Sequence, residues 1–164
     1  MIHTVNASAS AAEIRTLHEH YKHSRTVFSI DLPGYGFSER SDRHYNPRLM
    51  TDAIVALVEQ IHTRCGTAPV DALAASLSCE ILARAAMERP TYFRKLALVS
   101  PTGFQRNASR RKPLGSTLAL PMLHRAFTGP GWGGALFRGL TRLKVIRYFL
   151  GRAWGSPNID ETLW

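Results

Sequence analysis

Two short apolar runs place the strongest constraint on the fold. Residues 70–75 and 96–100 are rich in Val, Leu and Ala, and neither shows the regular polar alternation of a strand with one face in water. Residues 77–89 lie between them and are rich in helix formers, with Glu80 and Arg84 four residues apart before Pro90. Strands without alternation, separated by helices, are typical of a parallel sheet covered on both faces. The sequence therefore predicts an α/β fold, a parallel sheet flanked by helices.

The first part of the chain supplies one more helix and one more strand. Ser10 and Glu13 have the spacing of a capping box, and apolar residues follow at helical spacing, so residues 11–22 are predicted to form a helix. Residues 26–30, TVFSI, are rich in β-formers and predict a strand. This strand ends in Asp31-Leu32-Pro33-Gly34-Tyr35-Gly36, in which proline and glycines predict a sharp loop.

A long amphipathic helix is predicted to begin at Pro47. Asn46 is a favourable N-cap residue, proline is favoured at the first helical position, and Gly66 marks the end. The apolar residues of one face recur at helical spacing and comprise Met50, Ile54, Leu57, Val58 and Ile61.

Composition fits a folded, soluble chain. Of the 164 residues, 45% are hydrophobic and 20% are charged, which is ordinary for a globular protein. Cys65 and Cys79 cannot form a disulfide framework, and no Cys/His spacing indicates a metal site. No glycine-rich phosphate loop follows a predicted strand, so no cofactor is expected. In the absence of a leader or a long apolar run, the expected location is cytoplasmic.

The segment most informative about function is Ala74-Ala75-Ser76-Leu77-Ser78. Functional groups in parallel sheets gather at the carboxyl ends of strands, and here an apolar strand passes directly into a helix. Small residues around a serine at such a junction allow the close backbone approach of a nucleophile elbow. Serine is also a preferred helix N-cap, so Ser76 taken alone could serve only as a cap. Ser78 is a poorer candidate because Glu80 is too large for the elbow's small position.

Three segments, in the right order, resemble the α/β-hydrolase family. His3-Thr4-Val5-Asn6 is similar to the family's His-Gly oxyanion loop, with Thr4 in place of glycine. The run Asp31–Ser38 matches the D-x-P-G-x-G-x-S loop, and the elbow around Ser76 has Ala74 and Ser78 where glycines are usual. The resemblance covers residues 1–104, interpreted as a partial hydrolase core.

The resemblance implies hydrolysis of an ester or acyl-type substrate by a serine nucleophile. Ser76 would attack a carbonyl, and the backbone N–H groups of Leu77 and Val5 would hold the oxyanion. A serine at this position disfavours the family's dehalogenases and epoxide hydrolases, which use aspartate. Esterase, thioesterase and carbon–carbon bond hydrolysis stay open.

The catalytic acid and histidine of the family follow two further strands. Asp160 and Glu161 are not followed by a histidine, and His124 lies in a setting typical of a lid helix, so neither completes a triad. We therefore expect a chain truncated at both ends, with a hydrolase active in its full-length form and this chain inactive alone. The alternative is a non-catalytic remnant.

Residues 105–164 are interpreted as an incomplete, basic helical lid. Residues 101–164 hold ten Lys/Arg and two Asp/Glu, whereas residues 1–100 are nearly balanced. A lid would cover a small, lipophilic substrate; an interfacial helix in contact with a membrane surface is the alternative. No recognition motif for nucleic acid is present, so no such partner is expected. One side of a single helix is predicted to carry the apolar residues Leu136, Leu140, Leu143, Leu150 and Trp154, with Arg138 and Arg142 opposite and Arg147 interrupting.

Overall fold

The computed structural model describes residues 1–6, 9–102, 122 and 132–154. The chain forms two compact units, Met1–Thr117 and Leu118–Trp164. The first unit contains the sheet and is described first.

The sheet of the first unit is parallel, as predicted. Strands β1 (Val70–Ala75) and β2 (Phe93–Val99) pair in parallel, with Ala74 opposite Leu98. Ile2 adds a third parallel segment, since its N–H donates to Leu73 O (2.8 Å) and its carbonyl accepts from Ala75 N (3.2 Å). Ile30 pairs in parallel with Ile2 on the far side from β1. The order across the sheet is therefore Ile30, Ile2, β1 and β2.

The predicted strand over residues 26–30 is wrong in extent. Only Ile30 forms a bridge, through its N–H to Met1 O at 3.2 Å. The neighbouring segment around Ile2 offers only a short length of backbone for pairing with residues 26–30. The β-propensity of these residues alone therefore does not produce a strand.

Helix α2 (Pro47–Cys65) confirms the prediction from its caps. The Asn46 side chain accepts a hydrogen bond from Leu49 N at 2.9 Å, and Gly66 follows the last turn with φ of +92°. The predicted apolar face is directed inward, with Met50, Ile54 and Val58 buried.

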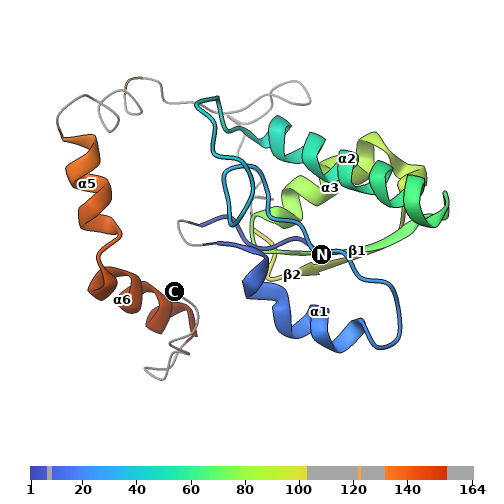
Figure 1. Ribbon diagram of the computed structural model, residues 1–164, viewed down its shortest axis with the longest axis horizontal. Helices are drawn as coiled ribbons and strands as arrows, with labels where there is room; N and C mark the ends of the chain where they lie inside the picture. The colour runs from blue at the N-terminus through green and yellow to red at the C-terminus, as the bar shows by residue number, and fades with distance from the viewer. Residues whose placement is uncertain (7–8, 103–121, 123–131, 155–164) are drawn as a thin grey trace. The chain divides into compact units, whose positions relative to one another are not determined.

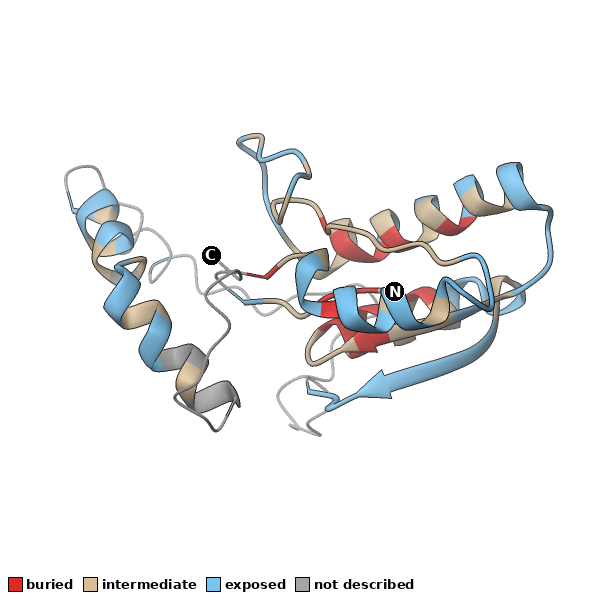
Figure 2. Ribbon diagram, turned by 60° about the horizontal axis from the view of Figure 1, so that its bottom comes forward, coloured by how far each residue is buried: buried red, intermediate tan, exposed pale blue. Residues whose placement is uncertain are grey.

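Helix α3 (Ser78–Glu88) packs against α2 and β1 and is followed by the 3₁₀ turn η2 (Pro90–Tyr92). Figure 1 shows α2 and α3 on one side of the sheet and α1 on the other. Figure 2 shows the buried residues concentrated between α2, α3 and β1. Burying this apolar surface supplies the main driving force for folding of the unit. The core cluster comprises Ile2, Leu32, Met50, Ile54, Ala74, Cys79, Ile81, Leu82 and Ala85.

The helix predicted over residues 11–22 is divided. A 3₁₀ turn, η1 (Ala11–Ile14), precedes α1 (Arg15–Tyr21). Ser10 caps η1 by accepting from Ala12 N at 3.3 Å, as its N-cap position requires. Glu13 does not complete the capping box, because its carboxylate binds Thr4 and Asn6 instead.

Strand β2 differs from the prediction of a strand buried on both faces. Its residues are exposed from Arg94 to Val99, as the pale strand in Figure 2 shows. Among the described elements, α3 contacts β2 less than it contacts β1, so the faces of β2 are poorly covered, and β1 is its one strand partner. The strand also starts three residues earlier than predicted and ends at Val99, since Ser100 has φ of +46°.

The described part of the second unit contains α5 (Gly133–Leu140) and α6 (Leu143–Trp154), which are joined through Thr141 and Arg142 and are in contact. The prediction that one helix carries these apolar residues is wrong, because the helical repeat breaks at Thr141, where φ is −90° and ψ is 9°. None of the helices formed by described residues combines the length and apolar character needed to cross a membrane.

Candidate functional site

Ser76 occupies a tight turn between β1 and α3. Its φ of +55° lies in the left-handed region, which costs a non-glycine residue about 1–2 kcal/mol. Three hydrogen bonds fix this conformation: Ser76 N donates to Val99 O (2.9 Å), and Ser76 O accepts from Cys79 N (3.1 Å) and Thr102 N (3.3 Å). Backbone strain that the surroundings maintain in this way is typical of functional positions.

The Ser76 side chain does not cap the helix. Leu77 is the N-cap residue of α3, and α3 has no side-chain capping bond. The Ser76 hydroxyl instead lies 3.5 Å from Thr102 Oγ1, at the limit of a hydrogen bond. The N-cap alternative is therefore wrong, and the hydroxyl remains at the carboxyl end of β1, beside the positive end of the α3 dipole.

Ser78 links α3 to the loop after Ile2. Its hydroxyl donates to His3 O at 2.5 Å, and both residues are fully buried. This bond holds the segment that leads into Thr4 and Val5 against the first turn of α3. No local pattern in the sequence indicated this role, since Ser78 stands where the hydrolase motif has a small residue without a side-chain donor.

The ring of His3 connects two loops at the same edge. Leu32 N donates to His3 Nε2 at 3.0 Å, so Nε2 carries no proton. The proton is therefore on Nδ1, which donates to Thr4 O at 2.5 Å. Both nitrogens of this buried histidine are engaged, and the ring acts as a structural connector.

Glu13 holds the loop formed by Thr4, Val5 and Asn6. Its carboxylate accepts from Thr4 N (3.0 Å), from Thr4 Oγ1 (2.7 Å) and from Asn6 Nδ2 (3.1 Å). The threonine that replaces the motif's glycine thus gains a partner for its hydroxyl. The Glu13 carboxylate does not accept a hydrogen bond from the next backbone donor along the loop, the Val5 N–H.

Two backbone donors are available near the turn. Among hydrogen bonds between described residues, none uses the N–H of Leu77 or of Val5. Leu77 directly follows Ser76, and Val5 follows a segment that Ile2 and His3 anchor to β1 and α3. Donors of this kind can stabilise negative charge that develops on a bound carbonyl oxygen.

The loop Asp31–Ser38 lies at the same sheet edge as Ser76, as expected, because Ile30, Ile2 and β1 are parallel. The Asp31 carboxylate accepts from Ala11 N (2.6 Å) and Phe37 N (2.9 Å), which ties the loop to η1. A Cβ at Gly36 would lie 2.2 Å from the Asp31 carboxylate, so only glycine fits there. Phe37 projects fully into solvent.

No described histidine forms a hydrogen bond with Ser76. His3 is engaged at both nitrogens, and His18 is paired with Ser29. His124, Asp160 and Glu161 lie outside the described residues, so their contribution stays a prediction. Within the described ranges, no three His, Cys, Asp or Glu side chains gather into a metal site.

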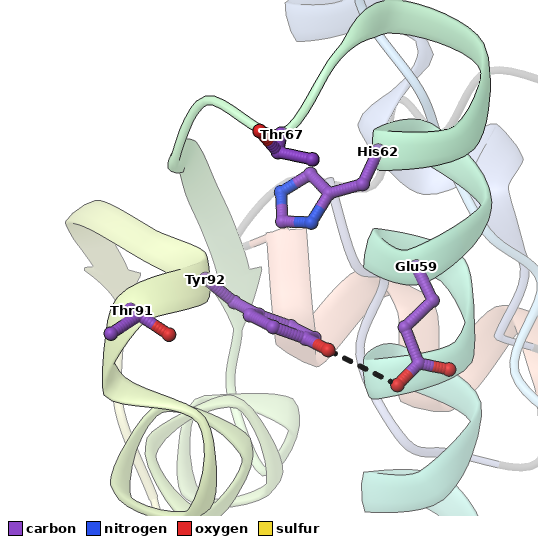
Figure 3. A pocket seen from close by; sticks show the side chains of 5 residues that line it. All are labelled: Glu59, His62, Thr67, Thr91 and Tyr92. Carbon is purple, nitrogen blue, oxygen red and sulfur yellow. Dashed lines mark hydrogen bonds between the residues drawn. The ribbon is translucent and has the colours of Figure 1, made fainter.

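A surface hollow of about 430 Å³ lies away from Ser76. Figure 3 shows its lining, with Tyr92 OH donating to Glu59 at 3.3 Å and the His62 ring edge-on to Tyr92. These residues come from the end of α2 and from η2, which precede β1 and β2 respectively. The hollow is therefore at the amino ends of the strands, opposite the edge that holds Ser76.

Comparison with known families gives one match over nearly the whole chain. The model of the alpha/beta hydrolase family matches residues 3–160. Neither the curated proteins nor the solved structures contain a significant match.

Proposed function

Because the chain belongs to the alpha/beta hydrolase family, we propose that it contributes the nucleophile of a serine hydrolase acting on esters or related acyl compounds. The observation that carries the proposal is the left-handed backbone of Ser76, at +55°, on the turn from a parallel strand into a helix. This conformation presents the hydroxyl beyond the end of the strand, where a substrate carbonyl can approach.

The proposed reaction has two steps. The Ser76 oxygen attacks the carbonyl carbon while its proton passes to a general base, and the N–H groups of Leu77 and Val5 hold the resulting oxyanion. Collapse of this intermediate expels the alcohol, which takes up the proton, and leaves an acyl group on Ser76. Water then attacks the acyl group and releases the acid.

The general base is the missing component of the described site. A serine hydroxyl is a weak nucleophile without one, and no described histidine forms a hydrogen bond with Ser76. We therefore propose that the base lies outside the described residues, at His124 or at a histidine in a longer, full-length form of the protein. We propose a small, lipophilic substrate, since Phe37 adds an exposed aromatic ring to a loop at this edge.

A fluorophosphonate probe tests the nucleophile. We expect slow labelling confined to Ser76, which Ser76→Ala abolishes. The matched control is Ser100→Ala, because Ser100 is also a positive-φ serine, placed after the adjacent parallel strand. The assignment would be overturned if labelling persisted in Ser76→Ala or if Ser100→Ala abolished it.

The base is tested by chemical rescue with imidazole on an activated ester. If the site lacks a base, imidazole should accelerate ester cleavage by the chain beyond its effect on Ser76→Ala. If His124 is the base, the unmodified chain should cleave the ester rapidly without imidazole, and imidazole should accelerate cleavage only by the His124→Ala variant. Both results support the proposed function. Equal rates for the chain and for Ser76→Ala in all conditions would favour the second candidate, a non-catalytic protein. The observation in its favour is that no described histidine forms a hydrogen bond with Ser76.

A further inference from the structure

We propose that the helix pair α5 and α6 lies on the surface of a bilayer that contains anionic phospholipids. The inference concerns the second unit alone and does not depend on the chemistry proposed for Ser76. It rests on the charge of this segment and on the side chains that it exposes.

The charged residues of this helix pair all have the same sign. Residues 132–154 contain no aspartate or glutamate. A cationic segment of this kind is attracted to the negative potential of anionic lipids, and each basic residue near the surface contributes about a fivefold gain in partitioning. The five basic residues of the segment are Arg138, Arg142, Lys144, Arg147 and Arg152.

Large apolar side chains are exposed among these cations. Phe137 is 66% exposed on α5, and Leu143 is 51% exposed at the start of α6. Leu136, Val145 and Ile146 are less exposed. Phe137 and Leu143 therefore keep more than half of their surface exposed and can enter an apolar environment.

The exposed apolar and basic residues are neighbours. Phe137 precedes Arg138, and Leu143 stands between Arg142 and Lys144; all of these side chains are exposed. Long basic side chains can extend toward phosphate groups while their stems and adjacent apolar residues enter the interface. Since neither helix is able to span a bilayer, the arrangement fits a helix pair that lies in the plane of the surface.

The test is co-sedimentation of the full 164-residue chain with vesicles. Phosphatidylcholine vesicles that also contain phosphatidylglycerol should bind the chain, and pure phosphatidylcholine should not. Arg138→Gln combined with Arg142→Gln should weaken binding by more than about tenfold. The matched control is Arg15→Gln with Arg64→Gln, which removes the same charge from exposed positions in the first unit and should change binding much less.

A second pair of variants tests insertion of the apolar side chain. Phe137→Ser should weaken binding at least about threefold, whereas Phe37→Ser, at the fully exposed phenylalanine of the first unit, should not. Ser76→Ala should bind as the unmodified chain does, which separates this proposal from the hydrolase proposal. Three results would overturn the inference. They are an equal loss of vesicle binding in the two double Arg→Gln variants, unchanged binding by Phe137→Ser, and stronger binding of the chain to RNA than to vesicles.

Discussion

The Ser78 hydroxyl donates a hydrogen bond of 2.5 Å to the main-chain carbonyl of His3, 75 residues away in the sequence. The bond joins the first turn of α3 to the segment that leads into Thr4 and Val5. It therefore connects the two stretches of backbone that carry the proposed oxyanion donors.

Removing this hydroxyl should destabilise the first unit. Ser78→Ala leaves the buried His3 carbonyl without a donor, which typically costs about 1–3 kcal/mol. Urea unfolding of the variant measures the change. Ser24→Ala is the matched control, because its exposed hydroxyl donates to Tyr21 O at 3.2 Å and water can replace it. An equal loss of stability in the two variants would contradict the prediction that the buried Ser78 hydrogen bond stabilises the unit more than the exposed Ser24 hydrogen bond does.

Gly36 should tolerate no side chain. Its φ is +49°, and a Cβ there would lie 2.2 Å from the Asp31 carboxylate. Gly36→Ala should therefore displace Asp31 from Ala11 N and Phe37 N and cost more than about 2 kcal/mol, since backbone strain adds to the lost hydrogen bonds.

Gly66→Ala separates the two causes. Gly66 also has a positive φ, +92°, but a Cβ added there would meet nothing within 4 Å. This variant should cost only the backbone penalty, on the order of 1–3 kcal/mol at a φ of +92° and a ψ of 161°, without the further loss of the Asp31 hydrogen bonds. Equal losses in the two variants, measured by urea unfolding, would show that contact with Asp31 adds nothing.

Local signals predicted much of this arrangement. Asn46, Pro47 and Gly66 fix the bounds of α2 because capping depends on nearby residues only. The turn at Ser76 was also predictable, since small residues surround it at a strand-to-helix junction.

Contacts between distant residues were not predictable. Glu13 has the spacing of a capping box, yet Thr4 and Asn6 compete for its carboxylate and bind it. The left-handed conformation of Ser100 and the connecting role of His3 likewise depend on partners far away in the sequence. The exposure of β2 depends on which elements pack on its two faces, and its apolar composition does not identify those elements.

The two cysteines should differ sharply in reactivity. Cys79 is fully buried, its thiol donates to Ala74 O at 3.2 Å, and burial raises the pKa of the thiol. A raised pKa lowers the thiolate fraction at neutral pH, and the thiolate is the reactive form. Cys65 is exposed. Iodoacetamide should therefore modify Cys65 in the native protein and Cys79 only after unfolding. Early modification of Cys79, detected by mass spectrometry in a Cys65→Ser variant, would contradict the buried position.

The backbone strain at Ser76 should lower the free energy of unfolding, and a substitution that relieves the strain should raise it. Glycine adopts a φ of +55° without steric penalty, so Ser76→Gly should stabilise the fold by about 1 kcal/mol. The loss of the hydroxyl offsets little, because its contact with Thr102 is 3.5 Å long. The same variant should lose all fluorophosphonate labelling. Ser100→Gly is the matched control, since it relieves a φ of +46°; it should gain similar stability in urea and retain labelling at Ser76. A Ser76→Gly variant less stable than the unmodified chain would mean that the serine side chain makes a favourable contribution larger than the strain, and the argument from its backbone to its function would lose its basis.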